Sequence, residues 1–212
     1  MPSTSVLHVF FHIYMIKAVI FDLNGIFIQA PKLGRRLEKD FGVDHEKFMP
    51  KLHEIMHQIR QPGARPAFSY WGEALKQWGI NFTEKDFWRY WFGGEEVSLR
   101  MVSFAKKLRE KGIKVFILSN NFKERSLYYN HYSWVHEAVD KIYFSWQTGF
   151  VKPDIRAWKN ILEENDLKPG ECIYFDDQEK NLKASTEAGI KAFQFITEKE
   201  LEKIVNMHLN TM

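Results

Sequence analysis

The chain lacks several features that would place it in particular classes of protein. Its 212 residues include one cysteine, Cys172, so no disulfide can form within the chain and a reducing compartment, the cytoplasm, is expected. The apolar run CIYF around Cys172 predicts a buried structural thiol. The formal net charge is only +3 and basic residues are interspersed with acidic ones, so no nucleic-acid partner is expected.

No apolar run has the length of a membrane span. The most apolar stretch near the N-terminus, VLHVFFHIYMI, is too short and is interrupted by His8 and His12, so no membrane partner is expected. No basic segment precedes it, which argues against a secretory signal. Residues 1–14 could form an upstream extension, an added strand or an interfacial segment, and the sequence leaves these alternatives open.

Short apolar runs alternate with helical patterns along most of the chain. The composition, 45% hydrophobic and 27% charged, suits one core or one core with a small second lobe. Buried strands are predicted at 18–23, 113–118, 172–175 and 191–195, and helices at 98–112, 152–165, 178–189 and 197–209. This alternation predicts an α/β fold, a doubly wound, Rossmann-like parallel sheet with helices on both faces.

Two of these helices carry more specific expectations. In the first, Leu99, Val102 and Leu108 lie on or near one apolar stripe, and Gly112 can end the helix. In the second, Pro153 is expected at the helix start.

Residues 30–97 show helical patterns without a clear strand. These patterns cover 32–41, 45–59, 70–79 and 83–92, and the turn-rich RQPGARP separates the second from the third. A cluster of aromatic residues at 82–92 suits the core of a small helical unit, although some rings could face a substrate or a partner copy. We therefore expect an α/β core of residues 1–28 and 99–212, with a helical cap at 29–98.

Polar residues follow the predicted strands at one edge of the sheet. Asp22 ends the first strand, Ser119 and Asn120 follow VFIL, Lys152 follows a turn, and Asp176-Asp177 ends CIYF. The carboxyl ends of parallel strands meet at one rim, so these groups should surround one cavity. Such a set suits phosphoryl transfer: carboxylates can hold a metal, a lysine and a hydroxyl can bind phosphate oxygens, and one carboxylate can attack phosphorus. Taken singly, each motif also suits an ordinary turn or helix cap.

The four motifs FDLNGI, ILSNN, KPD and FDDQEKN, in this order, resemble those of the haloacid dehalogenase superfamily. The helical insertion resembles the small cap of its first subgroup, and the chain is similar to the small-metabolite phosphatases there. The resemblance implies hydrolysis of a small phosphorylated metabolite with Mg²⁺ as the cofactor. Asp22 would be the nucleophile and a metal ligand, with Asp177 and the backbone carbonyl of Asn24 as further ligands.

The same resemblance assigns the remaining rim residues. Ser119, Asn120 and Lys152 would hold the phosphate, and Lys152 would also shield Asp22 from its acidic neighbours. Asp176 would bind the metal through water or lie behind its direct ligands, and Asn181 would orient the residues of the rim.

Asn24 departs from the motif, since the family's phosphatases carry aspartate at this position. That aspartate protonates the leaving oxygen and then activates water, and an amide can do neither. Three alternatives follow: a weakened phosphatase, a silent phosphate-binding pseudoenzyme, or a C–halogen hydrolase, although the dehalogenases lack an acidic pair such as Asp176-Asp177. A further hypothesis is that Asn24, followed by Gly25, deamidates to the missing aspartate, because glycine leaves its backbone nitrogen unobstructed.

A competing motif, HEIMH at residues 53–57, matches the helical His-Glu-x-x-His pattern of zinc peptidases. His53 and His57 would share a helix face, and Glu54 could act as a base. Glu73 would have to be the third ligand, and the motif lies in the insertion, away from the predicted rim. A solvated helix surface explains these histidines more simply.

Overall fold

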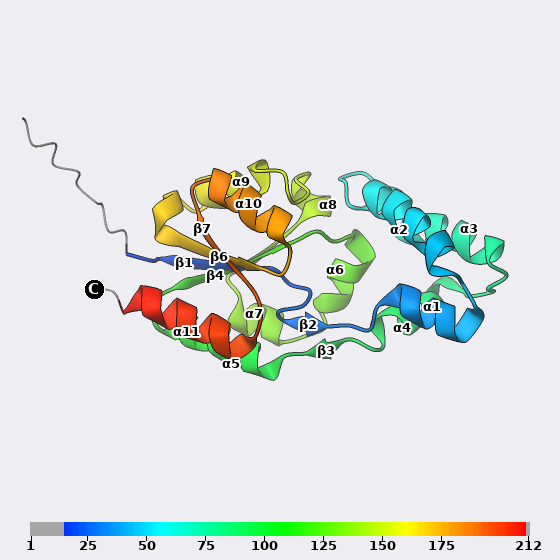
Figure 1. Cartoon of the computed structure of the whole chain (residues 1–212), viewed down its shortest axis with the longest axis horizontal. Coiled ribbons are helices and arrows are strands. Elements are labelled where there is room, and N and C mark those ends of the chain that lie inside the picture. Colours follow the sequence, from blue (N-terminus) through cyan, green and yellow to red (C-terminus); the bar gives the residue numbers. More distant parts are fainter. Residues whose placement is uncertain (1–14, 211–212) are drawn as a thin grey trace, which may run out of the picture.

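The computed structural model describes residues 15–210, so the alternatives for residues 1–14 lie outside the described part. At its centre is a parallel sheet of five strands in the order β5-β4-β1-β6-β7 (Figure 1). The strands are β1 (Ala18–Phe21), β4 (Lys114–Ser119), β5 (Lys141–Phe144), β6 (Cys172–Asp176) and β7 (Lys191–Gln194). Four of them confirm the predicted strands, and β1 lies at the centre of the sheet.

The fifth strand, β5, is absent from the strand predictions. It is a four-residue edge strand, with an exposed Lys141 and a half-buried Ile142, so its sequence lacks the long apolar run of a central strand. It pairs with β4 alone, in the register Phe116–Lys141 to Ser119–Phe144.

Helices cover both faces of the sheet, as predicted. On one face lie α5 (Leu99–Glu110), α7 (Trp134–Ala138) and α11 (Glu198–Leu209), and on the other α9 (Arg156–Glu164) and α10 (Glu179–Glu187) (Figure 1). Alternate strand residues serve the two faces: Val19 and Phe21 join the first core, and Ala18 and Ile20 join the second. Cys172 is buried as a free thiol.

Two details of the helix predictions are wrong. Leu99 is 78% exposed, because it is the first residue of α5 and precedes the buried stripe that starts at Met101. Pro153 does not start a helix, since α9 begins at Arg156 and Pro153 lies in the preceding turn. The end of α5 at Gly112 is confirmed by a left-handed backbone, with φ of 78°.

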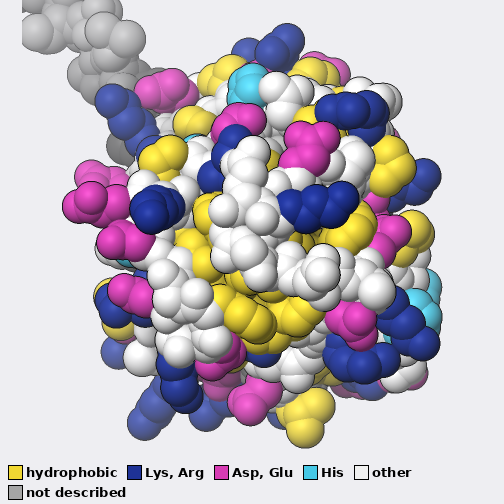
Figure 2. Space-filling model, turned by 90° about the vertical axis from the view of Figure 1, so that its right-hand side faces the viewer, with side chains coloured by type: hydrophobic (Ala, Val, Ile, Leu, Met, Phe, Trp, Pro, Cys, Tyr) yellow, Lys and Arg dark blue, Asp and Glu magenta, His cyan; other side chains and the backbone are white. Residues whose placement is uncertain are grey.

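The insertion forms four helices at one end of the molecule (Figure 1). They are α1 (Leu33–Phe41), α2 (His45–Ile59), α3 (Ala67–Gln77) and α4 (Glu84–Phe92). RQPGARP is the loop between α2 and α3, as predicted. The helices share a hydrophobic core of their own, in which Trp71 is fully buried against Phe87 and Trp91. The outer face of this end shows apolar side chains in its middle with charged side chains around them (Figure 2).

Two connections tie the insertion to the sheet. A short antiparallel pair, β2 (Ile28–Gln29) with β3 (Glu96–Val97), holds the entry and exit segments side by side. The pair is missing from the predictions because each strand has only two residues. The second tie is Phe122, the residue before α6 (Lys123–Tyr129), whose ring packs against Trp88, Trp91 and Phe92.

Candidate active site

Asp22 stands one residue beyond the carboxyl end of β1 and is almost completely buried. The Lys152 ammonium lies 2.9 Å from its Oδ1, and the backbone N–H of Leu23 donates to the same oxygen at 2.7 Å. Burial raises the pKa of Asp22 to about 6, and Lys152 opposes that rise. The carboxylate is therefore fixed in position but has little water around it.

Lys152 connects Asp22 to the second acid of the rim. Its Nζ donates to Asp176 Oδ2 at 2.8 Å and to the Tyr174 hydroxyl at 3.2 Å. Burial works against its charge, but Asp22 and Asp176 outweigh burial and raise the pKa of Lys152 above its ordinary value. The side chain of Asn120 holds the Lys152 backbone, donating to its carbonyl at 2.8 Å and accepting from its N–H at 2.7 Å.

Asp176 is saturated with hydrogen bonds. Besides Lys152 and Tyr174, it accepts from the backbone N–H of Gln178 at 2.8 Å and from Asn181 Nδ2 at 3.0 Å. Burial disfavours its charge, but Lys152 overcomes that and lowers the pKa of Asp176. Asp177 differs, because it is exposed and lines the cavity.

The donor set fits a hard divalent cation. Carboxylate oxygens of Asp22, Asp176 and Asp177 lie within 4.8 Å of one another, and within residues 15–210 they are the one such group of acidic, histidine or cysteine side chains. Oxygen ligands without sulfur or imidazole suit Mg²⁺. Three carboxylates beside one ammonium also leave an excess of negative charge. His53 and His57 are exposed and not part of this group.

Asn24 is half-buried at the edge of the cavity, and its Oδ1 accepts from the Tyr129 hydroxyl at 3.4 Å. The next residue, Gly25, has φ of 87°, a left-handed conformation that glycine adopts readily. Its N–H donates to the Ile28 carbonyl at 2.8 Å, which closes a tight turn directly after the strand.

The remaining predicted residue, Ser119, is placed differently. It is fully buried at the end of β4, its hydroxyl has no hydrogen-bond partner, and it does not line the cavity. Asn120, the next residue, does line it.

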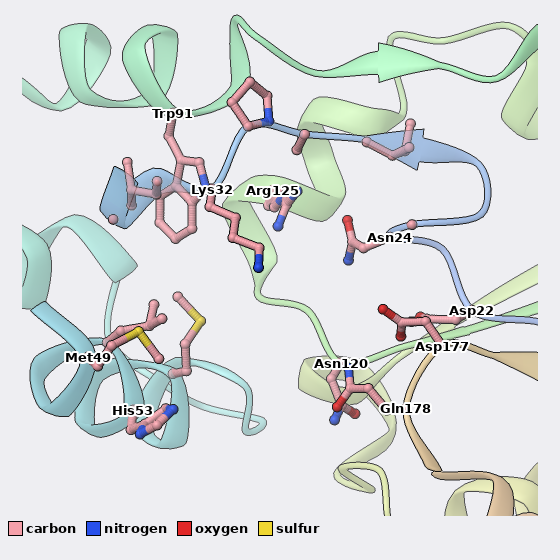
Figure 3. Close-up of a pocket in the computed structure, with 18 of the residues that line it drawn as sticks. Asp22, Asn24, Lys32, Met49, His53, Trp91, Asn120, Arg125, Asp177 and Gln178 are labelled. Carbon is pink, nitrogen blue, oxygen red and sulfur yellow. The ribbon is translucent and has the colours of Figure 1, made fainter. Parts of the chain in front are cut away.

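A cavity of about 700 Å³ lies between the rim and the helical insertion. Asp22, Asp177, Asn120 and Gln178 are on one side, and Met49 and His53 of α2 face them from the other (Figure 3). Phe48, Leu52 and Met56 extend the apolar wall contributed by α2. A phosphate ester would therefore meet polar groups at the rim and apolar groups at its far end.

Several cavity residues were not predicted. Arg60, Arg125 and Lys32 line the cavity, and Tyr129 reaches Asn24 from α6. Arg60 lies in the turn-rich loop and Lys32 precedes a helix, places where an isolated cation carries no sequence signal. Only the folding of the insertion over the rim brings them near Asp22.

Comparison with known proteins agrees with this architecture. The family model described as haloacid dehalogenase-like hydrolase matches residues 96–195. A haloacid dehalogenase family enzyme of Bacteroides thetaiotaomicron superimposes with a TM-score of 0.78 at 23% identity, covering 90% of this chain and 98% of that one. Residues 96–195 therefore resemble the haloacid dehalogenase-like hydrolases in sequence, and the chain shares the fold of that solved enzyme.

Curated relatives of similar length are phosphatases. D-ribitol-5-phosphate phosphatase of B. thetaiotaomicron is 26% identical over 85% of this chain and 92% of its own. Sesquiterpene phosphatase of Aspergillus oryzae is 26% identical over 82% of this chain and 87% of its own. The haloacid dehalogenase family enzyme of B. thetaiotaomicron that superimposes on this chain has also been solved with magnesium and inorganic phosphate. That structure aligns with a TM-score of 0.74 at 24% identity, covering 88% of this chain and 98% of that one.

Proposed function

We propose that this chain is a member of the haloacid dehalogenase superfamily and a Mg²⁺-dependent hydrolase of small phosphate monoesters that acts through Asp22. The observation that carries the proposal is the Asp22 carboxylate, held by Lys152 at 2.9 Å within a group of three acids, of which Asp22 and Asp177 line a cavity. The relatives named phosphatases support the same reaction class. The acidic group argues against a C–halogen hydrolase, which has no use for a carboxylate metal site.

Two steps describe the reaction. An Asp22 oxygen forms a bond to phosphorus as the ester O–P bond breaks, and the leaving oxygen takes its proton from water because Asn24 has none to give. Water then attacks the phosphorus of the aspartyl phosphate, which releases inorganic phosphate and restores the Asp22 carboxylate. Asp22, Asp177 and the backbone carbonyl of Asn24 would hold Mg²⁺, which supplies positive charge beside the phosphoryl oxygens.

Each remaining rim residue has a role that its contacts support. Lys152 keeps Asp22 ionised and, through Asn120, has a fixed position beside the phosphate. Asp176 anchors Lys152 and does not line the cavity, and Asn181, which does line it, holds Asp176 from α10. Ser119 would contact phosphate only if its hydroxyl turned out of the core.

A screen of phosphate monoesters with and without Mg²⁺ tests the proposal, with wild type beside Asp22→Asn. We expect turnover that requires Mg²⁺ and is lost in Asp22→Asn. Mg²⁺-independent turnover, or activity that survives in Asp22→Asn, would refute it. If wild type binds phosphate but neither wild type nor Asn24→Asp hydrolyses any ester, the protein is instead the phosphate-binding pseudoenzyme.

A further inference from the structure

Arg60 is an unpaired cation in the cavity. It follows the last residue of α2, and its Nε is buried without a hydrogen-bond partner. Within residues 15–210, no hydrogen bond or ion pair joins its guanidinium to another side chain or to the carbonyls at the end of α2. Buried polar atoms in proteins are normally hydrogen-bonded, so a guanidinium in a cavity with its Nε unsatisfied suggests a ligand.

The other cations of the cavity are accounted for. Lys152 is paired with Asp22 and Asp176, and Arg125 is paired with Glu95 at 2.5 Å. The remaining three are exposed to water, namely Lys32, Arg35 and Lys180. Arg60 is therefore the one cation of the described cavity that is largely removed from water and lacks an acid.

The charges of Arg125 and Asp22 both act on the Arg60 guanidinium. Burial and the charge of Arg125 lower the pKa of Arg60 to about 10, and the charge of Asp22 opposes this, so the guanidinium remains protonated at neutral pH. Two residues further on, Pro62 lies against Gly149 of the core, at ordinary van der Waals distance from where a Cβ would be. The loop after α2 thus contacts the core three residues before Lys152.

The charges at the rim leave a place for this cation. Three carboxylates beside the Lys152 ammonium have an excess of two negative charges, which one Mg²⁺ would balance. A phosphate monoester brings about two more negative charges at neutral pH, and the further core cations that line the cavity are Arg125, which is paired with Glu95, and Lys180, which is exposed to water. A guanidinium that lines the same cavity as Asp22 can donate two parallel hydrogen bonds to phosphoryl oxygens.

We infer that Arg60 binds the phosphoryl group that Asp22 accepts, and that the cap therefore completes the phosphate site as well as enclosing the substrate's body. This inference rests on the proposed function for its reaction, but its binding claim can be tested without turnover. It assigns to the end of α2 a role that the four motifs of the core do not contain.

The test compares wild type with Arg60→Gln, in the presence of Mg²⁺, by calorimetric binding of inorganic phosphate and by hydrolysis of p-nitrophenyl phosphate. We expect Arg60→Gln to weaken phosphate binding about 10- to 100-fold, the effect of one charge-assisted hydrogen-bonding group, with a similar fall in kcat/KM. Arg60→Lys should recover part of the binding, since it restores the charge but not the planar fork. Lys47→Gln is the matched control, because Lys47 is an exposed cation of the same helix outside the cavity lining.

Two results would overturn the inference. One is phosphate affinity in Arg60→Gln within about twofold of a folded wild type. The other is a loss confined to esters with a second anionic group, for example 3-phosphoglycerate but not glycerol 3-phosphate, with inorganic phosphate unaffected. That result would mean that Arg60 binds the second anionic group of the substrate and not the phosphoryl group that Asp22 accepts. Phosphate binding that depends on Arg60 in a chain without esterase activity would support the inference and refute the proposed reaction.

Discussion

At the scale of single residues, Asn24 decides how well the site can work. An amide cannot protonate the leaving oxygen or activate water, and general acid–base help is worth about 10²–10⁴-fold. Asn24→Asp should therefore raise turnover of alkyl phosphates by a factor of that order. p-Nitrophenyl phosphate should gain least, because its leaving group departs without a proton.

Steady-state kinetics of both proteins on glycerol 3-phosphate and p-nitrophenyl phosphate measure this contrast. Asn24→Gln is the matched control, since it retains an amide. Equal alkyl phosphatase activity in wild type and Asn24→Asp would show that position 24 is not the acid–base residue.

A second residue-scale prediction concerns deamidation of Asn24. The reaction needs the Gly25 nitrogen to attack the side-chain amide, but the Gly25 N–H donates to Ile28 at 2.8 Å and the Tyr129 hydroxyl holds Asn24 Oδ1. We therefore expect the folded protein to keep Asn24 for longer than the chain unfolded in urea. Peptide mass spectrometry of residues 18–32 from aged folded and unfolded samples measures both rates. Faster conversion in the folded protein would mean that the fold promotes the reaction. It would support the hypothesis that Asn24 deamidates to the missing aspartate.

At the scale of elements, the sequence predicts those strands and helices whose apolar run or helical periodicity extends over enough residues. Central strands such as β1 and β6 are unbroken apolar runs, and the four insertion helices have clear periodicity, so both were predicted. The edge strand β5 and the two-residue β2–β3 pair were missed, because their pairing depends on a neighbour already in place. The same limit applies to the site. Asp22, Lys152 and Asp177 follow strands or motifs, whereas only tertiary packing brings Arg60 to the cavity and Tyr129 to Asn24.

Phe122 is the element-scale contact with the clearest consequence. It follows the Asn120–Asn121 loop of the site, yet its buried ring packs into the aromatic core of the cap. Phe122→Ala should lower the free energy of unfolding by about 3–5 kcal/mol, through lost burial and the cavity left behind. Because the ring joins α6 to α4, KM should also rise more than kcat falls.

Urea unfolding and steady-state kinetics test both effects, with Leu127→Ala as the control on the same helix, where the side chain is 47% exposed. The control should change stability by no more than about 0.5 kcal/mol. A small effect of Phe122→Ala would mean that β2 and β3 alone hold the cap in place.

At the scale of the whole molecule, acidic residues of the core and a cation with apolar residues of the cap line the same cavity. The sheet contributes acids at the ends of β1 and β6, and the cap contributes Arg60 together with the apolar wall of α2. None of the described helices is long and apolar enough to cross a membrane. The predicted fold class is confirmed by the parallel five-stranded sheet and by the matching solved structure. The predicted Mg²⁺ cofactor agrees with the magnesium in a solved relative, while the domain limits of 29–98 and the roles of single residues stay predictions.

The acidic group should make the stability of the whole molecule depend on Mg²⁺. Three carboxylates with one ammonium repel one another, and a cation that binds only the folded chain stabilises it by mass action. At 100 times its dissociation constant, Mg²⁺ should add about 2.7 kcal/mol, which raises the Tm of a domain of this size by roughly 5–10 °C. Asp177→Asn should lose most of this shift, because Asp177 is a proposed metal ligand that is exposed and does not support the core. Thermal unfolding at increasing Mg²⁺, with Asp154→Asn as an acidic control outside the cavity, provides the measurement. An equal Mg²⁺ shift in wild type and Asp177→Asn would remove Asp177 from the metal site.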